Sequence, residues 1–190
     1  MTKHIGWTVA ATLLFCATAE ARPRFYIELR GVKEPDKTRP SLKDKARAVV
    51  LEEFGKQPAV VTSLGDPPPK GKELSKALKA RRLIGYGVVL RITKVNHSIN
   101  PPAKGKAYRV LMVEVAVAID AEKIPSGQMA LAGEGTAQVG TEISRFKEKE
   151  RVQLTHEALT EAVRQAVGKS VNKLSGGGKV KRRRGRRRRR

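Results

Sequence analysis

The sequence predicts an α+β domain with two layers and the element order β-α-β-α-β-β-β-α, in which a largely antiparallel sheet carries helices packed on one face. Two patterns predict it. Apolar residues alternate with polar ones in a short first segment and in three longer central segments, which is the period of a strand with one buried face. In three other segments apolar residues recur at three- and four-residue spacing, which is the period of an amphipathic helix.

The first half of the domain is expected to form a strand, two helices and a short strand between them. Residues 25–30 alternate as Phe-Tyr-Ile-Glu-Leu-Arg. Ser41 has capping-box spacing to Asp44, and the helix that follows ends at Gly55. The β-branched run 58–64 precedes a proline-rich loop. A second helix follows and is surrounded by six cations: Lys70, Lys72, Lys76, Lys79, Arg81 and Arg82.

The centre of the domain is expected to form three consecutive antiparallel strands at 85–95, 107–121 and 128–141. A loop at 99–105 and a tight turn at 124–127 connect them. Strands joined by such short connections pair as hairpins, so the centre is predicted to be a β meander.

The charged residues of the middle strand are expected to lie at the surface. Glu114 faces away from the apolar side of the strand, where it is either exposed or paired across strands with Arg91 or Arg109. Asp120 and Glu122 stand at the end of the strand and are expected to be turn residues.

The clearest helix closes the domain and is followed by a charged tail. Apolar and small residues recur at helical spacing from Leu154 to Leu174, with Thr155 as the expected amino-terminal cap and Gly176 as the stop. Residues 176–190 begin with three glycines and then carry ten cations and no acid. Because like charges repel and too few apolar residues are present to form a core, this tail is expected to be disordered.

The first 21 residues have the pattern of a secretory signal. Lys3 provides a positive start, residues 8–17 form an apolar run, and Ala19-Glu20-Ala21 matches the small-x-small cleavage pattern. Cleavage is expected after Ala21. No later segment is long and apolar enough to span a membrane, so we expect no transmembrane segment and a processed chain that is periplasmic or secreted.

The single cysteine, Cys16, lies inside this signal. Lipid attachment requires a small residue before the cysteine, and Phe15 is large, so a lipoprotein anchored at Cys16 is disfavoured. Once the signal is removed, the chain has no cysteine and can form no disulfide. Residues 22–175 are therefore expected to form a single domain that is stabilised by its own core.

The chain is strongly basic, with 40 Lys and Arg against 18 Asp and Glu and a formal net charge of +22. Large charge of one sign favours encounters with polyanions. For an exported chain the candidate polyanions are lipopolysaccharide, phospholipid headgroups, acidic wall or capsule polymers, and extracellular DNA. The expected polyanion-binding residues are Lys179, Lys181, Arg182, Arg183, Arg184, Arg186, Arg187, Arg188, Arg189 and Arg190.

No group of residues predicts a catalytic centre, a metal site or a cofactor. The two histidines outside the signal, His97 and His156, have no Cys, His or carboxylate at metal-ligand spacing. Glu134 lies between Gly133 and Gly135, but no helix is expected to start there. Small residues in a strand that passes close to a helix explain these glycines better. We therefore expect a protein that is not an enzyme.

The element order resembles that of a domain found in several bacterial envelope proteins. The passages that carry the resemblance span about residues 24–174 and read RFYIEL, PAVVTSL, RRLIGYGVVLRITKV, YRVLMVEVAVAIDAEKIPSG and THEALTEAVRQAVGKSVNKL. In this order the chain is similar to the curli-export lipoprotein, to the lipoprotein activators of penicillin-binding proteins and to the amino-terminal domain of the periplasmic translocation protein TolB. The resemblance implies a non-enzymatic module that works by contact with another envelope component. The chain lacks an insertion that resembles a membrane-spanning hairpin, so pore formation is disfavoured.

Three functional interpretations follow. In the first, the chain is a binding or tethering module that contacts an envelope protein and uses its basic tail on anionic surfaces or polymers. In the second, it is an assembly component of a secretion or cell-wall synthesis apparatus, and the tail is incidental. In the third, it binds extracellular nucleic acid by salt-sensitive phosphate contacts without base stacking, since the tail contains no aromatic residue.

Overall fold

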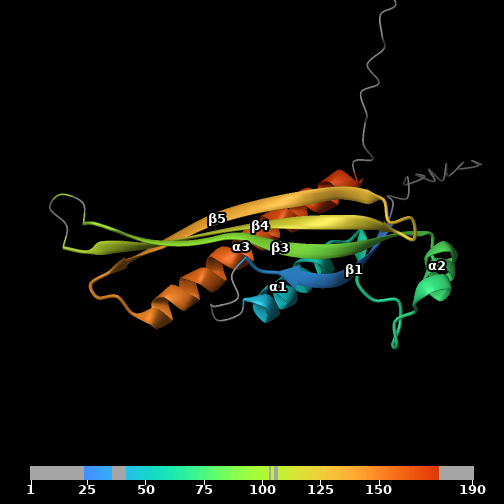
Figure 1. The fold of residues 1–190 in the computed structure, drawn as a ribbon, viewed down its shortest axis with the longest axis horizontal. Helices are drawn as coiled ribbons and strands as arrows, with labels where there is room; N and C mark the ends of the chain where they lie inside the picture. The colour runs from blue at the N-terminus through green and yellow to red at the C-terminus, as the bar shows by residue number, and fades with distance from the viewer. Residues whose placement is uncertain (1–23, 36–41, 103, 105–106, 176–190) are drawn as a thin grey trace, which may run out of the picture.

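The computed structural model describes residues 24–35, 42–102, 104 and 107–175. These residues form a five-stranded sheet and three helices in the order that the sequence predicts (Figure 1). The elements are β1 (Arg24–Lys33), α1 (Lys43–Gly55), β2 (Val60–Val61), α2 (Gly71–Ala80), β3 (Leu83–Asn100), β4 (Arg109–Ile124), β5 (Met129–Ile143) and α3 (Glu148–Ser175). Within the described part of the chain, no helix has the length and apolar character needed to cross a bilayer.

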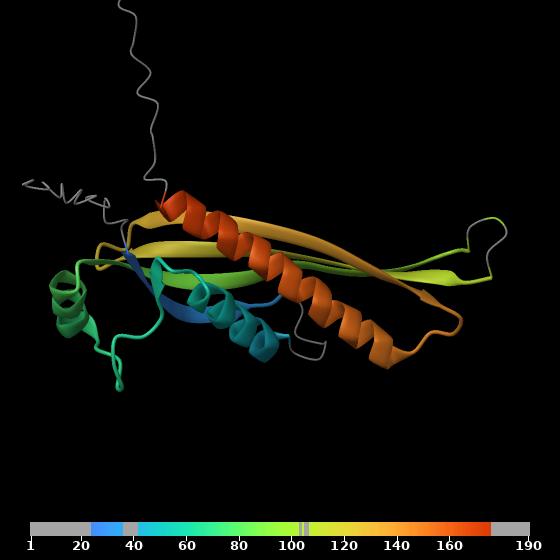
Figure 2. The same ribbon diagram turned by 180° about the vertical axis from the view of Figure 1, so that it is seen from behind.

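The sheet is mixed, with the strand order β2-β1-β3-β4-β5. The three long strands β3, β4 and β5 pair antiparallel, which confirms the predicted meander. β1 lies parallel to both β2 and β3. The β3–β4 hairpin extends past the helices at one end of the molecule, as both ribbon views show (Figures 1 and 2).

The main core lies between one face of the sheet and the helices α1 and α3, which cover it (Figure 2). The alternation in β4 decides which side chains enter it: Leu111, Val113 and Val115 are buried, while the residues between them are only partly buried. The two-layer α+β prediction is therefore confirmed, and the period-2 pattern of the sequence correctly identifies the buried face.

The helix α2 stands apart from the other two helices, at one end of the sheet (Figures 1 and 2). It closes a small second core, which consists of Tyr26, Leu64, Leu74, Leu78 and Leu83. Gly85 allows the helix to lie this close to the sheet, because a Cβ atom at that position would meet the Leu78 side chain at 2.6 Å. The cations that surround this helix in the sequence are thereby placed at one end of the molecule.

The glycines of β5 lie where α3 crosses the strand. A Cβ atom on Gly133 would collide with Ala166 and Ser170, and one on Gly135 would collide with the backbone of Ala162. The interpretation of these glycines as a close approach of strand and helix is confirmed. Every fourth residue of α3 in this stretch is correspondingly small.

The first helix is not capped as the capping-box spacing predicts. Ser41 lies outside the described residues, and the residue at the cap position is Leu42, which makes no side-chain cap hydrogen bond. The backbone N–H of Leu42 instead donates to Oε1 of Glu34 at 2.5 Å. A carboxylate eight residues away thus bonds the backbone at this helix terminus, a contact that local spacing could not reveal.

The last helix begins earlier than predicted, at Glu148 rather than near Thr155. Its first turn has little apolar periodicity and is supported by charge: Arg151 pairs with Glu148, and Lys147 with Glu150. Thr155 lies inside the helix, where its hydroxyl donates to the Arg151 carbonyl oxygen at 2.7 Å.

The loop that the sequence predicts at 99–105 begins later in the structure, because β3 continues to Asn100.

Candidate functional site

The face of the sheet opposite α1 and α3 carries three ion pairs that cross between strands. Their side chains are partly exposed, so each pair contributes about 0–1 kcal/mol to stability. The pairs are Arg30–Glu122 (2.7 Å), Arg91–Asp120 (2.6 Å) and Lys94–Glu114 (2.7 Å). This face therefore balances its cations with acids.

These pairings correct two predictions for β4. Glu114 pairs with Lys94 rather than with Arg91 or Arg109, because an irregularity in register after Ile92 brings Lys94 within reach. Asp120 and Glu122 are strand residues rather than turn residues, since β4 continues to Ile124. The hydrogen bond and the negative charge of Asp120 raise the pKa of Arg91.

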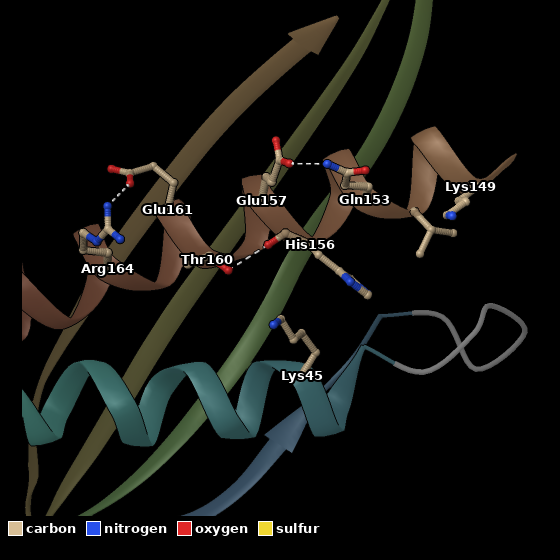
Figure 3. Close-up of a pocket in the computed structure, with 9 residues that line it drawn as sticks. Lys45, Lys149, Gln153, His156, Glu157, Thr160, Glu161 and Arg164 are labelled. Atoms are coloured by element: carbon tan, nitrogen blue, oxygen red, sulfur yellow. Dashed lines mark hydrogen bonds and ion pairs between the residues drawn. The ribbon is translucent and has the colours of Figure 1, made fainter. Parts of the chain in front are cut away.

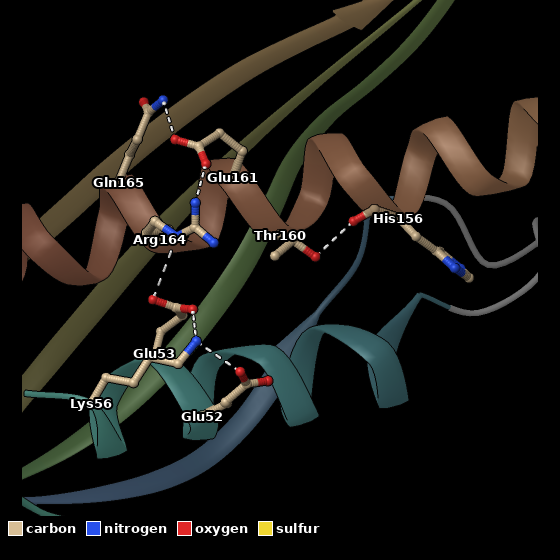
Figure 4. Close-up of polar contacts among 8 residues, drawn as sticks. All are labelled: Glu52, Glu53, Lys56, His156, Thr160, Glu161, Arg164 and Gln165. Carbon is tan, nitrogen blue, oxygen red and sulfur yellow. Dashed lines mark hydrogen bonds and ion pairs between the residues drawn. The ribbon is translucent and has the colours of Figure 1, made fainter.

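Helices α1 and α3 are joined by a charged cluster around Glu53 (Figure 4). Glu53 lies on α1 and is only 4% exposed. Its carboxylate is 2.7 Å from Lys56 Nζ and 3.8 Å from Arg164 Nε of α3. Lys56 also bonds Glu52 at 2.7 Å, and this hydrogen bond lowers the pKa of Glu52. The cluster stabilises the contact between the two helices.

An open groove of about 540 Å³ lies between the same two helices, nearer to their amino-terminal ends (Figure 3). Its acidic groups bond to neighbours on α3: Glu157 accepts from Gln153 at 3.0 Å, and Glu161 accepts from Arg164 at 2.8 Å. The Thr160 hydroxyl donates to the backbone of its own helix. These bonds join residues three or four positions apart on α3, as on any helix face that is exposed to solvent.

The two histidines lie in separate places. His97 is on β3, and its Nε2 is 3.1 Å from the Thr155 hydroxyl of α3. Because that hydroxyl gives its hydrogen to the Arg151 carbonyl, His97 Nε2 is the donor of this bond. His156 lies in the groove between α1 and α3. The described residues contain no group of three His, Cys, Asp or Glu side chains that could hold a metal ion.

The clearest imbalance of charge lies around α2. We call the cations of this region the α2 basic surface, and they are Lys70, Lys72, Lys76, Lys79, Arg81 and Arg82. All six are exposed, and within the described ranges none of them forms an ion pair. Arg81 donates to the backbone carbonyl of Leu64 at 3.2 Å, and Glu73 is the only acid in residues 70–82.

The arrangement of the α2 basic surface follows from helical spacing. Lys72, Lys76 and Lys79 are separated by four and three residues, so they share one face, while Leu74 and Leu78 are buried on the other. Like charges four residues apart destabilise a helix by about 0.2–0.5 kcal/mol. An anion bound against this face would relieve that repulsion.

The polyanion-binding residues that the sequence predicts, from Lys179 to Arg190, lie outside the described residues, as do the predicted signal, its cleavage site and Cys16. The α2 cations were visible in the sequence as a local excess of charge. Their lack of acidic partners was not, because ion pairing depends on which strands and helices come together in the fold.

No protein-family model matches the chain, and no curated protein sequence matches it. Some solved structures are similar. The minor lipoprotein from Acinetobacter baumannii is 12% identical over 77% of this chain and 91% of its own, with a TM-score of 0.43. A Xanthomonas campestris protein of family DUF330 is 10% identical over 83% of this chain and 89% of its own, with a TM-score of 0.42. Rare lipoprotein B from Shewanella oneidensis is 10% identical over 80% of this chain and 94% of its own, with a TM-score of 0.33. These similarities assign the chain to no family and to no activity.

Proposed function

We propose that this chain is a non-enzymatic protein of the bacterial envelope that binds anionic surfaces by charge. The α2 basic surface is the observation that carries the proposal. Its six exposed cations have no acidic partner among the residues that the structure describes, whereas the cations of the open sheet face pair with acids. The sequence adds ten more cations in residues 179–190.

Binding of this kind needs no pocket. Lysine and arginine near a surface of opposite charge raise the rate of encounter, and the arginine guanidinium can donate two hydrogen bonds to one phosphate. Residues 176–190 reach at most about 50 Å when extended, so the tail can contact a surface that the domain does not touch. Salt screens such contacts, so the binding is expected to weaken as ionic strength rises.

The test compares the intact chain with two variants in bacterial envelope fractions washed at rising salt. One variant lacks residues 179–190, and in the other the ten tail cations are replaced by glutamine, which keeps the length of the tail. We expect both variants to leave the envelope at lower salt than the intact chain. Retention of both variants to the same salt concentration as the parent would show that the tail makes no contact.

The second interpretation, an assembly component with a protein partner, is favoured by a different observation. At the end of the molecule opposite α2, Ile99, Tyr108 and Phe146 are 44%, 51% and 46% exposed. Exposed aromatic and aliphatic side chains are typical of protein contacts. A photoreactive amino acid at Tyr108 should then crosslink to one dominant protein with or without the tail, and a crosslinker at Lys72 should not. Equal crosslinking from both positions would speak against this surface.

A further inference from the structure

Three parts of the fold meet at the α2 end of the molecule. β3 begins directly after α2, and Gly85 near its start pairs with Ile124, next to the β4–β5 turn. α3 runs back along β5, and its residue Ser170 lies beside Gly133 of that strand. Both ribbon views show α3 ending toward this end (Figures 1 and 2). The basic tail therefore starts toward the same end as the α2 basic surface.

Further features extend the charge of this end. Arg24 at the start of β1 and Lys123 before the β4–β5 turn are exposed, and neither has an ion pair within the described residues. Met129, which begins β5, is 64% exposed. The α2 end thus combines a cluster of long cationic side chains with an exposed apolar side chain at its edge.

We propose that the α2 end is a docking surface for an anionic phospholipid bilayer, on which the molecule stands with its β3–β4 hairpin directed away from the membrane. This inference rests on the proposed function. It adds the contact surface on the folded domain, the kind of surface that is bound, and the orientation of the bound molecule.

The shape of the α2 end favours a bilayer over a nucleic acid. Lys72, Lys76 and Lys79 lie along one exposed helix face, which suits a broad charged plane. Single-stranded nucleic acids are bound on aromatic side chains, and the exposed aromatic residues Tyr108 and Phe146 lie at the opposite end. Lysine and arginine close to an anionic leaflet each add to membrane binding, and their aliphatic stems can lie along apolar surface while the charge reaches the headgroups.

The test uses the processed chain with its tail and measures sedimentation with vesicles of phosphatidylcholine containing phosphatidylglycerol. One variant carries Lys70→Gln, Lys72→Gln, Lys76→Gln and Lys79→Gln. A matched control carries Lys104→Gln, Arg109→Gln, Arg145→Gln and Lys149→Gln, which removes the same charge from the opposite end. We expect the α2 variant to bind at least about tenfold more weakly, and the control to change by less than about threefold.

Orientation gives an independent measurement. The chain that begins after Ala21 contains no cysteine of its own. A fluorophore is therefore attached at Gln128→Cys beside the β4–β5 turn or at Lys104→Cys in the hairpin loop, and a quencher is placed in the bilayer. The fifteen residue steps of β3 from Gly85 to Asn100 span about 50 Å at the rise of a strand. Quenching is expected at position 128 and not at position 104.

Each of the following results would overturn the inference while leaving the proposed function standing: equal weakening by the α2 variant and its control, equal quenching at both labels, or an α2 variant that keeps its vesicle affinity but loses binding to duplex DNA. Failure of the intact chain to bind anionic vesicles, with salt-sensitive retention in the envelope still present, would also reject the bilayer as the partner. Loss of that retention would instead reject the proposed function itself. Far-ultraviolet circular dichroism of both quadruple variants checks that they fold.

Discussion

Glu53 is the one charged side chain among the buried described residues, and its place explains how α1 and α3 are held together. A buried carboxylate is costly unless it is paired. Lys56 supplies one partner from the next turn of the same helix, and Arg164 supplies another from α3. The Glu53 carboxylate is thus paired with a cation from each helix. Glu53 therefore has a structural role at the interface between the helices rather than a role in the open groove beside it.

Replacing Glu53 by glutamine is therefore expected to lower the free energy of unfolding by about 1–2 kcal/mol, because the amide keeps the shape but loses the charge that both cations approach. The matched control is Glu52→Gln, which removes an exposed acid from the same lysine. Urea unfolding followed by circular dichroism measures both. A control that costs as much as Glu53→Gln would mean that the contact to Arg164 contributes nothing.

At the scale of elements, the gap between α3 and β5 is set by glycine. Gly133 and Gly135 let the strand lie close against the helix, because a Cβ atom on either glycine would collide with helix backbone, at Ala166 or at Ala162. The sequence predicts this contact, because both of its parts can be recognised locally: the small residues of the strand by their identity and the helix by its apolar spacing. The pairing of Lys94 with Glu114 and the contact of Glu34 with Leu42 were missed, since each depends on a register irregularity or on residues brought together by the fold.

Gly135→Ala tests this close approach. The added methyl group would collide with the carbonyl of Ala162, which is backbone and cannot rotate away. The variant is expected to lose about 3 kcal/mol of stability. Gly168→Ala is the control, because Gly168 is inside α3 with no atom near the added methyl group, and it should gain about 0.5–1 kcal/mol from helix propensity. Thermal and urea unfolding report both changes, and a Gly135→Ala protein as stable as the parent would show that α3 can shift freely.

At the scale of the whole molecule, charge is distributed unevenly over a single core. The sequence alone predicts the basic tail and the local excess of lysine and arginine in residues 70–82. It does not predict that α2 lies at the end of the sheet, nor that α3 returns to that end, because both follow from the order and length of the strands. The fold therefore places the α2 cations toward the end at which α3 finishes.

Deletion of residues 179–190 is expected to leave the stability of the domain almost unchanged. The main core, from Phe25 to Val171, is closed by described residues. At high salt the free energy of unfolding should therefore change by less than about 0.5 kcal/mol. At low salt the deletion should be slightly more stable than the intact chain, because it removes ten of the cations that give the net charge of +22 and so relieves self-repulsion, which salt otherwise screens. Urea unfolding of both chains at low and high salt measures the difference. A loss of more than about 1 kcal/mol at both salt concentrations would show instead that the tail packs on the domain, and that its cations are not free to reach a separate surface.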